Sequence, residues 1–186
     1  MPVDGRVSLS LHAGAFTTEI ANVIADPNRV LIVECSPNFP RTFGAGDYQH
    51  SIAFEDIDFL VQSDRVALNL ADVVASDVES RIAEIAVTYI HDGCTLQTGI
   101  GGIPTQVATR LAAGSGGDYG IHSEMFTTGL MRLHQSGKVT NHKGTEFDGF
   151  SVTTFAAGEP ELYTWLHENS DVRFLPVNIV NSPEVI

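Results

Sequence analysis

The sequence predicts an α/β protein with a mainly parallel sheet and flanking helices. From residue 76 onward, short apolar segments alternate with segments of helical periodicity of roughly 10–15 residues, which is the order of repeated βαβ units. Residues 29–35 form a β-branched apolar run, typical of a buried parallel strand. Two strand-to-helix corners, near residues 99 and 124, lie close together in the chain. Parallel strands joined by helices require crossovers, which are right-handed in nearly all known cases.

The first part of the chain has shorter predicted elements. Residues 7–11 alternate apolar side chains with serine, which predicts a strand, and residues 17–25 begin on threonine and have the apolar spacing of a helix. Two prolines in residues 36–42 exclude ladder hydrogen bonds and a regular helix, so a rigid loop is expected there. Short extended segments are expected at 51–54 and 57–61.

The chain divides most naturally near residue 72, into a first unit of residues 1–72 and a second unit of residues 73–186. The second unit opens with a predicted helix over 76–90, because Ser76 is followed three residues later by Glu79, as in a capping box. Strands then follow at 95–98, 119–123, 149–155 and 172–176, and helices at 104–113, 125–135 and 160–167.

The composition describes a folded chain with a large negative charge. Of its 186 residues 43% are hydrophobic and 18% are charged, which excludes wholesale disorder. Ten Lys and Arg against 23 Asp and Glu give a formal charge of −13, which opposes binding to nucleic acid or to an anionic membrane. Cys35 and Cys94 lie in apolar segments and form no close pair, so buried thiols in a reducing, cytoplasmic compartment are expected. No signal peptide or membrane-spanning apolar run is recognised.

One carboxylate stands out at the end of the predicted strand 119–123. Glu124 lies where that strand meets the predicted helix 125–135, and strand ends that open into helices are where α/β proteins place reacting groups. Glu124 is therefore the candidate nucleophile. The alternative is a carboxylate that satisfies unpaired N–H groups of the helix N-terminus. The neighbouring His122 either makes a structural hydrogen bond or helps to set the ionisation of Glu124.

A glycine turn, Gly99-Ile100-Gly101-Gly102, links a predicted strand to a helix expected to start at Pro104. Such a turn brings backbone N–H groups outward, which suits an oxyanion or a phosphate. Tight packing of a helix on a strand also selects glycine, so a purely structural role is the alternative. The turn is not the dinucleotide fingerprint, because proline occupies the position of its last glycine.

Asn181 follows the last predicted strand and is either a turn former or a polar group on the same strand-end surface as Glu124. The histidines do not repeat at metal-ligand spacing and the two cysteines are far apart, so no metal site is expected. The sequence also lacks a G-x-S-x-G elbow and a P-loop, which argues against the usual serine hydrolase and NTPase chemistries.

Seven short motifs occur in a fixed order along the chain. They read NFPRT at 38–42, DIDFLV at 56–61, QTGIGGIP at 97–104, GIHSEM at 120–125, GKVTN at 137–141, FAAG at 155–158 with LY at 162–163, and PVNIVNSP at 176–183. Together they resemble the acetyl-CoA hydrolase/transferase family of class I CoA-transferases, especially its 4-hydroxybutyrate and butyrate CoA-transferase branch. The likeness runs nearly from end to end and implies a CoA-transferase-like fold.

The resemblance also implies roles for individual residues. Glu124 falls at the catalytic glutamate of the family and Asn181 at an asparagine that positions it. Contacts to the CoA substrate and the oxyanion hole are implied for the glycine turn, Gly99, Ile100, Gly101 and Gly102. The family uses no permanently bound cofactor. It moves coenzyme A between an acyl-CoA and a short-chain carboxylic acid through a glutamyl-CoA thioester.

The chain departs from the family in extent. Family members are considerably longer and continue beyond the segment around Asn181, and the beginning of their first domain has no counterpart here. Residues 177–186 show no helix, cap or polar tail, so the chain is expected to be cut. We therefore expect the end of a first CoA-transferase domain in residues 1–72 and the beginning of a second in residues 73–186. A homodimer, or the missing part of the enzyme, is expected to cover its open sheet edges.

Three other functions stay open at this point. Hydrolysis of acyl-CoA needs only that water reaches the same glutamyl thioester. A non-catalytic binding or assembly module would keep the fold without a complete CoA site. A sugar-phosphate isomerase or lactonase-like protein of related architecture would use Glu124 as a base.

Overall fold

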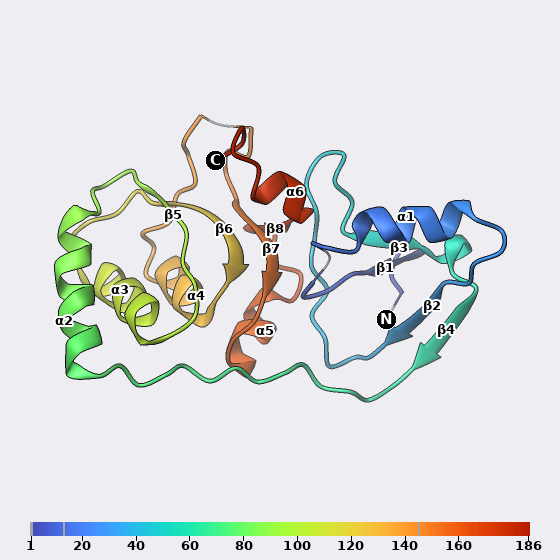
Figure 1. The fold of residues 1–186 in the computed structure, drawn as a ribbon, viewed down its shortest axis with the longest axis horizontal. Helices are drawn as coiled ribbons and strands as arrows, with labels where there is room; N and C mark the ends of the chain where they lie inside the picture. The colour runs from blue at the N-terminus through green and yellow to red at the C-terminus, as the bar shows by residue number, and fades with distance from the viewer. Residues whose placement is uncertain (1, 13, 145) are drawn as a thin grey trace.

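The computed structural model describes residues 2–12, 14–144 and 146–186 (Figure 1). Its strands are β1 (Arg6–Ser8), β2 (Ile32–Cys35), β3 (Ser51–Ala53), β4 (Phe59–Gln62), β5 (Thr95–Leu96), β6 (Gly120–Phe126), β7 (Ser151–Ala156) and β8 (Val172–Phe174). Its α-helices are α1 (Thr17–Ala25), α2 (Asp77–Ala86), α3 (Gly102–Ala113), α4 (Thr128–Gln135), α5 (Pro160–Leu166) and α6 (Val177–Val180), and two short 3-10 turns cover Phe54–Asp56 and Val87–Tyr89. No helix in these three described ranges has the length and apolar character needed to cross a bilayer.

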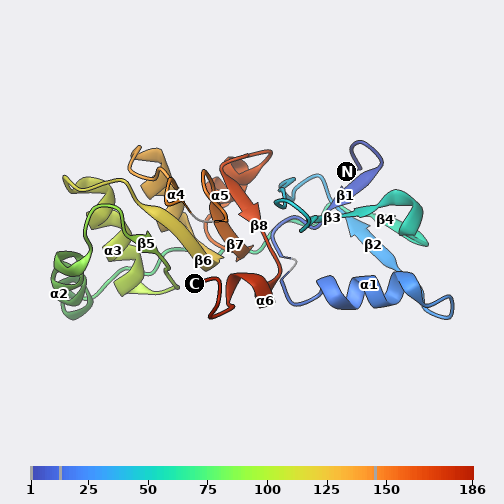
Figure 2. The same cartoon turned by 90° about the horizontal axis from the view of Figure 1, so that it is seen from above.

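The main sheet has four parallel strands in the order β5-β6-β7-β8. Because consecutive strands are neighbours and crossovers share one hand, the connecting helices fall on the same face of the sheet. Helices α3, α4 and α5 pack in series on that face, whereas the short α6 contacts β6 and β7 from the other side (Figure 2). The predicted α/β class with a mainly parallel sheet is confirmed.

The largest apolar core lies between this sheet and the helices α4 and α5. Phe126 and Phe174 on the strands meet Leu130 of α4 and Leu162 of α5, and all four side chains are essentially inaccessible to solvent. Burying large apolar side chains in this way supplies most of the stability of a small domain. A smaller cluster of Val152, Leu175 and Val180 lies on the α6 face. The second unit thus has a core on both faces of its sheet.

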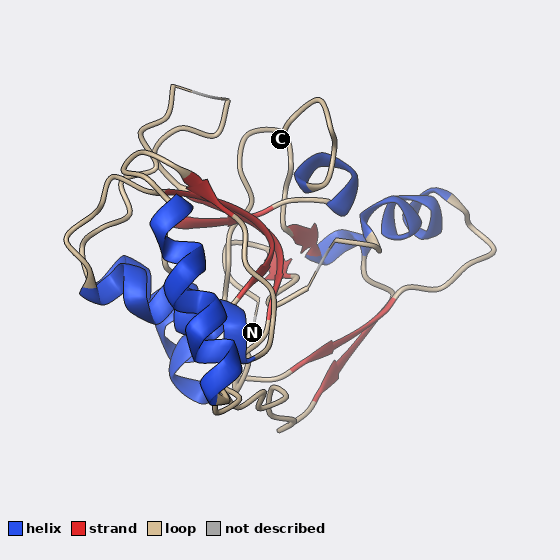
Figure 3. Ribbon diagram, turned by 60° about the vertical axis from the view of Figure 1, so that its left-hand side comes forward, coloured by secondary structure: helices blue, strands red, loops and turns tan. Residues whose placement is uncertain are grey.

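The first part of the chain has much less core. Strand β1 pairs with β3 in antiparallel fashion, and β2 pairs with β4 in parallel, as a separate two-stranded sheet (Figure 3). The expectation that residues 29–35 form a buried strand is wrong for its burial, because Ile32 is 62% exposed and its pairing partner Phe59 is 61% exposed. Helix α1 likewise has no buried residue. A two-stranded sheet offers no layer against which these faces can pack.

Most boundaries of the second unit agree with the predicted elements, and the differences have local causes. The capping box of Ser76 and Glu79 is present, but α2 ends at Ala86 and continues as a 3-10 turn. Helix α4 starts at Thr128 and not at 125, because β6 stays paired with β7 as far as Phe126. The expectation of no helix in residues 177–186 is also wrong, since these residues begin with α6.

Residues 63–76 form an extended connection between β4 and α2 (Figure 1). Residues 68–72 of this connection are attached to the second unit, whereas residues 63–65 are hydrogen-bonded to the first. Leu70 donates its N–H to the carbonyl of Gly158 at 2.9 Å, the hydroxyl of Tyr163 donates to the carbonyl of Leu68, and Asp72 pairs with Arg132 at 2.7 Å. The division of the chain near residue 72 stays a prediction.

Two buried histidines predict a loss of stability in acid. Burial lowers the pKa of His50 to about 4, and burial also lowers the pKa of His134 to about 4. Both therefore stay neutral in the folded chain while the unfolded chain takes up protons near the ordinary value of 6.5. Stability is therefore full above about pH 6.5 and is lost as the pH falls toward 4, by roughly 3 kcal/mol for each imidazole.

Urea unfolding between pH 7 and pH 4 measures this effect. We expect His134→Gln to flatten the pH dependence of the unfolding free energy, and the same change at the exposed His91 to leave it unchanged. A wild-type profile that is flat over this range would contradict the assignment of neutral buried imidazoles.

Candidate active site

Glu124 lies inside strand β6, between β5 and β7. The expectation that it stands where a helix begins is wrong, because the side chain of Thr127 caps α4 by accepting the N–H of Leu130. Its carboxylate is therefore held by a strand and not by a helix N-terminus. The backbone carbonyl of Glu124 accepts a hydrogen bond from the hydroxyl of Thr153 on β7 at 3.0 Å. The side chain is half-buried, so one carboxylate is presented from a well-paired central strand.

Asn181 meets Glu124 although 57 residues separate them in the chain. Its side-chain Nδ2 donates to the Oε2 of Glu124 at 2.7 Å. Its backbone ends α6, where its N–H donates to the carbonyl of Val177 at 2.9 Å. The two alternatives for Asn181 therefore both describe part of its geometry: the backbone terminates a helix and the amide contacts the carboxylate. A hydrogen bond to a charged oxygen restricts the rotation of the carboxylate.

His122 holds the helix that carries Asn181. It lies two residues before Glu124 on β6, so both side chains point to the same face of the sheet. Its Nε2 is 2.7 Å from the carbonyl oxygen of Val180, the residue before Asn181. Because a carbonyl can only accept, this nitrogen carries the proton. The geometry thus gives His122 the structural hydrogen bond, which fixes the position of α6 against β6.

The glycine turn lies next to Glu124 through the register of the sheet. Strand β5 pairs Leu96 with Ile121, and Thr98 continues this pairing by donating its N–H to the hydroxyl oxygen of Ser123 at 3.2 Å. Gly99 follows Thr98, and Glu124 follows Ser123, on these two neighbouring segments. The sheet therefore brings the two strand-to-helix corners of the sequence side by side.

The backbone of the turn requires glycine at residue 101 and leaves N–H donors free. Gly101 has φ +119°, a conformation that L side chains rarely adopt, and a Cβ on Gly102 would approach a carboxylate oxygen of Glu79 to 2.8 Å. Within the described part of the chain, the N–H groups of Gly99, Ile100 and Gly101 have no hydrogen-bond acceptor. An oxyanion needs free N–H groups of this kind.

A cavity of about 130 Å³ opens beside the turn, at the carboxyl ends of β6 and β7. Gly99, Ile100 and Gly101 line one side of it, and Thr127 and Gly158 belong to the opposite walls. Ligands of parallel α/β sheets bind beyond the carboxyl ends of the strands. Glu124 is not part of this lining. The turn therefore adjoins Glu124 through strand register, whereas the cavity itself extends toward residues 70–73 of the connection between β4 and α2.

Sequence reasoning missed the hydroxyl side chains around Glu124. Ser123 is fully buried and ties Thr98, the residue before the glycine turn, to β6, and Thr153 anchors the backbone of Glu124. Thr154 lies opposite Glu124 on β7, is 2% exposed, and its hydroxyl has no partner among the described residues. The available signal was a run of hydroxyl residues in strands that are otherwise apolar. Buried hydroxyl groups in native proteins usually have a hydrogen-bond partner, as those of Ser123 and Thr153 have here.

No protein-family model matches the sequence. Over 162 residues the chain is 38% identical to a 4-hydroxybutyrate coenzyme A transferase of Clostridium kluyveri, which covers 87% of this chain and 36% of that protein. It is 31% identical to a butyryl-CoA:acetate CoA-transferase of Anaerostipes caccae, over 81% of this chain and 34% of that protein. The chain therefore spans about a third of the length of these curated relatives.

Comparison of the fold with solved structures agrees with the comparison of sequences. The crystal structure of a 4-hydroxybutyrate CoA-transferase from Porphyromonas gingivalis matches the whole of this chain with a TM-score of 0.84 and 31% sequence identity. The matched part is 45% of that protein. Agreement of sequence and fold over most of the chain excludes a chance likeness of common α/β architecture. By both criteria, the chain belongs to the CoA-transferase family that includes the 4-hydroxybutyrate and butyrate enzymes, and it represents a part of their length.

Proposed function

We propose that this chain carries the nucleophile of a CoA-transferase, which moves coenzyme A between a short-chain acyl-CoA and a carboxylic acid. Glu124 is the nucleophile. The observation that carries the proposal is the contact between Asn181 and Glu124 beside a glycine turn with free N–H groups. These groups come from three separate segments of the sequence, and the sheet register and α6 bring them to one edge. The identity of the relatives supports the same chemistry.

The proposed reaction exchanges a thioester and an anhydride. A carboxylate oxygen of Glu124 attacks the thioester carbonyl of the acyl-CoA, and the C–S bond breaks to release the CoA thiolate and leave an acyl-glutamyl anhydride. The thiolate then attacks the glutamyl carbonyl, which releases the first acid as its carboxylate and leaves a glutamyl-CoA thioester. The second acid takes the coenzyme by the same steps in reverse. A carboxylate suits this exchange because it both attacks and leaves.

The surrounding groups have distinct proposed tasks. Asn181 donates to one oxygen of Glu124, which leaves the other oxygen free to attack and fixes the rotamer of the carboxylate. The free N–H groups at Gly99 to Gly101 would stabilise the oxyanion that develops on the thioester carbonyl. His122 positions Asn181 through α6. Coenzyme A is a substrate in this scheme, and no bound cofactor takes part.

Chemical trapping tests the proposal directly. The chain is incubated with acetyl-CoA, treated with borohydride, digested, and the peptide that contains Glu124 is analysed by mass spectrometry. A glutamyl thioester is expected to be reduced to a primary alcohol at Glu124, and hydroxylamine is expected to convert it to a hydroxamate. A covalent adduct at a different residue, or none after either treatment, would overturn the assignment of the nucleophile.

Hydrolysis of acyl-CoA and a non-catalytic assembly module are the alternative functions. The module is favoured by the apolar surface that β2 and β4 leave open, where Ile32 and Phe59 are largely exposed. An assay with and without a carboxylic acid acceptor distinguishes transfer from hydrolysis. A transferase gives new acyl-CoA only when a second carboxylate such as butyrate is present, whereas a hydrolase releases free coenzyme A without it.

We also propose the acyl groups that the protein transfers, its cellular compartment and its partner. Acetyl and butyryl thioesters are the proposed donors, because both acyl groups occur in the name of a relative, a butyryl-CoA:acetate CoA-transferase. The two cysteines are free, which supports a reducing compartment such as the cytoplasm. A second copy of the chain, or the part of the enzyme that lies outside it, is the proposed cover for the open β2–β4 face.

Asn181→Ala separates a positioning role from a structural one. The side chain of Asn181 is exposed, so its removal is expected to lower the unfolding free energy by less than about 1 kcal/mol. The rate of thioester formation at Glu124 is expected to fall by tenfold or more, about the effect of one lost hydrogen bond to a charged group. Thermal melting and the trapping rate measure the two quantities. A large melting shift with an unchanged rate would make Asn181 a turn former only.

A further inference from the structure

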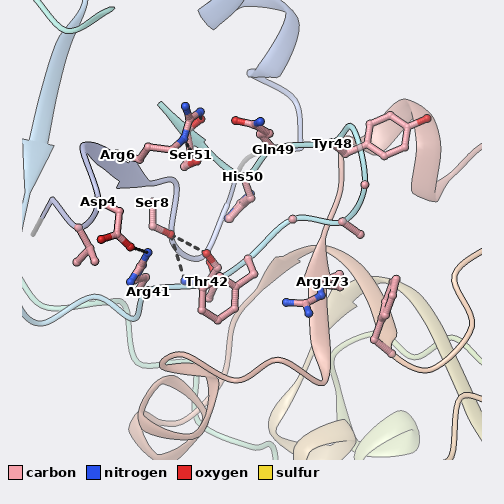
Figure 4. Close-up of a pocket in the computed structure, with 16 residues that line it drawn as sticks. Asp4, Arg6, Ser8, Arg41, Thr42, Tyr48, Gln49, His50, Ser51 and Arg173 are labelled. Carbon is pink, nitrogen blue, oxygen red and sulfur yellow. Dashed lines mark hydrogen bonds and ion pairs between the residues drawn. The ribbon is translucent and has the colours of Figure 1, made fainter. Parts of the chain in front are cut away.

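A second hollow, of about 590 Å³, lies between the first part of the chain and the β8 edge of the main sheet (Figure 4). Its walls come from the loop of residues 41–51, the strand β1 and the side chains of Phe150 and Arg173. Glu124, Asn181 and the glycine turn are not part of it. Strand β8 lies two strands from β6, about 10 Å across the sheet. This hollow is therefore separate from the candidate active site.

Three arginines line this hollow, although the chain has only ten Lys and Arg and a formal charge of −13. They are Arg6, Arg41 and Arg173, and Figure 4 shows all three around the hollow. Asp4 is the one carboxylate of the described lining. In a strongly acidic protein, a local excess of positive charge in a concave site attracts anions that the rest of the surface repels.

Arg173 is held in place without an acidic partner. Its guanidinium carbon lies 5.6 Å from the ring centre of Phe43 and 5.5 Å from that of Phe150. No hydrogen bond or ion pair of its side chain occurs among residues 2–12, 14–144 and 146–186. Stacking on aromatic rings engages the faces of the guanidinium and leaves its N–H groups at the edge free. The group is thus oriented but not neutralised.

The other two arginines differ in how they are held. Arg6 donates to the side chain and to the carbonyl of Ser51, at 2.7 and 2.9 Å, and has no carboxylate partner in the described part of the chain. Arg41 pairs with Glu168 at 3.3 Å, lies 3.9 Å from Asp4, and also stacks on Phe43. The hollow therefore keeps uncompensated positive charge on Arg6 and Arg173. Preoriented guanidinium groups bind carboxylate and phosphate oxygens with high geometric fit.

We propose that this hollow is a binding site for a small oxyanion, either the carboxylate of an organic acid or a phosphate group. Arg173 makes the main contact in this site, and Arg6 and Arg41 contribute from the facing wall. The aromatic walls, Phe43 and Phe150, accommodate an organic part attached to the anion. The site does not depend on the chemistry of Glu124.

Titration of the chain with two probes tests the proposal. Inorganic phosphate and succinate are added separately at constant ionic strength, and backbone amide shifts are followed by NMR, with chloride as the reference anion. Saturable shifts confined to residues 41–51 and to the neighbourhood of Arg173 are expected for at least one probe. The tighter probe identifies the source of the oxyanion. Shifts that are absent for both probes, or that spread over the whole surface without saturation, would overturn the proposal.

Matched variants distinguish binding at a specific site from a general effect of positive charge. Arg173→Met is expected to weaken the tighter probe by tenfold or more, because it removes a charge-assisted contact. Arg6→Met provides a second test if the first variant fails to fold. Arg81→Met, which removes the same charge from an exposed residue paired with Glu84 on α2, is expected to leave binding unchanged. Equal weakening by Arg81→Met, or unchanged binding by both hollow variants, would contradict the site.

Discussion

Replacing Glu124 by Gln is expected to abolish thioester formation, with a loss of at least about a thousandfold, because an amide neither attacks a thioester nor leaves an anhydride. Glutamine keeps the shape of the side chain and an oxygen that accepts the Nδ2 donor of Asn181. The folded structure is therefore expected to be unchanged. The measurement is the yield of the trapped adduct after incubation with acetyl-CoA, compared with wild type under the same conditions.

The control for this experiment removes a carboxylate elsewhere. Glu55 lies in the exposed 3-10 turn of residues 54–56, and Glu55→Gln changes the net charge by the same amount. The adduct is expected to form normally in this variant. If Glu124→Gln still gave a trapped thioester, the nucleophile would be another residue and the proposed mechanism would fail. Loss of the adduct in both variants would instead indicate an effect of charge.

Phe126→Ala is expected to lower the unfolding free energy by about 3–5 kcal/mol, the usual cost of removing a large buried aromatic side chain and leaving a cavity. Phe126 is 0% exposed, packs in the largest core cluster and stacks on Trp165 with ring centres 5.8 Å apart. It is also two residues from Glu124 on β6. Urea denaturation followed by tryptophan fluorescence and circular dichroism measures the change.

The same substitution at Phe59 is the matched comparison. Phe59 lies on β4 and is 61% exposed, so Phe59→Ala is expected to change the unfolding free energy by less than about 1 kcal/mol. The contrast tests whether the first part of the chain lacks a core of its own. A loss at Phe59 as large as the loss at Phe126 would contradict this expectation and would favour the second copy of the chain as the cover of the β2–β4 face.

Local rules were sufficient for most elements of the second unit. The Ser76–Glu79 capping box marks the start of α2, and the proline at the start of α5 is favoured at the first helical position. Alternation of short apolar strands with helices also predicted the parallel order, because each βα pair adds one strand beside the last. In these segments, local preference and tertiary packing agree.

The remaining features depend on contacts between distant segments. The helical spacing at 125–135 favoured a helix from Met125 onward, but pairing of β6 with β7 extends the strand to Phe126 and moves Glu124 off the helix. Helix α6 has only four residues and is held by His122 from β6, which the local sequence does not indicate. The prediction that residues 29–35 are buried was wrong, because the described residues form no layer that covers this strand.

The site was visible only in part from the sequence. Glu124, Asn181 and the glycine turn were each chosen as candidates and one surface was an expectation for them, but the contacts that bring them together follow from the strand register and from α6 docking on β6. The hydroxyl groups of Ser123 and Thr153 that hold this geometry were not identified. A pattern along one chain shows which residues are unusual, whereas the sheet decides which of them are neighbours.

The strap of residues 68–72 couples the two units mechanically. A connection without helix or strand ordinarily acts as a hinge, and its backbone is open to proteases. Here the carbonyl of Leu68, the backbone of Leu70 and the carboxylate of Asp72 are each fastened to the second unit. Residues 63–65 are fastened to the first unit instead, through the carbonyl of Cys35 and the side chains of Ser36 and Asn38, so the connection passes from one unit to the other at residues 66–67. A cut there would leave the wall of the cavity beside the glycine turn in place, and the backbone hydrogen bonds that Leu11 and Phe43 make with strands β7 and β8 would still hold the first unit to the main sheet.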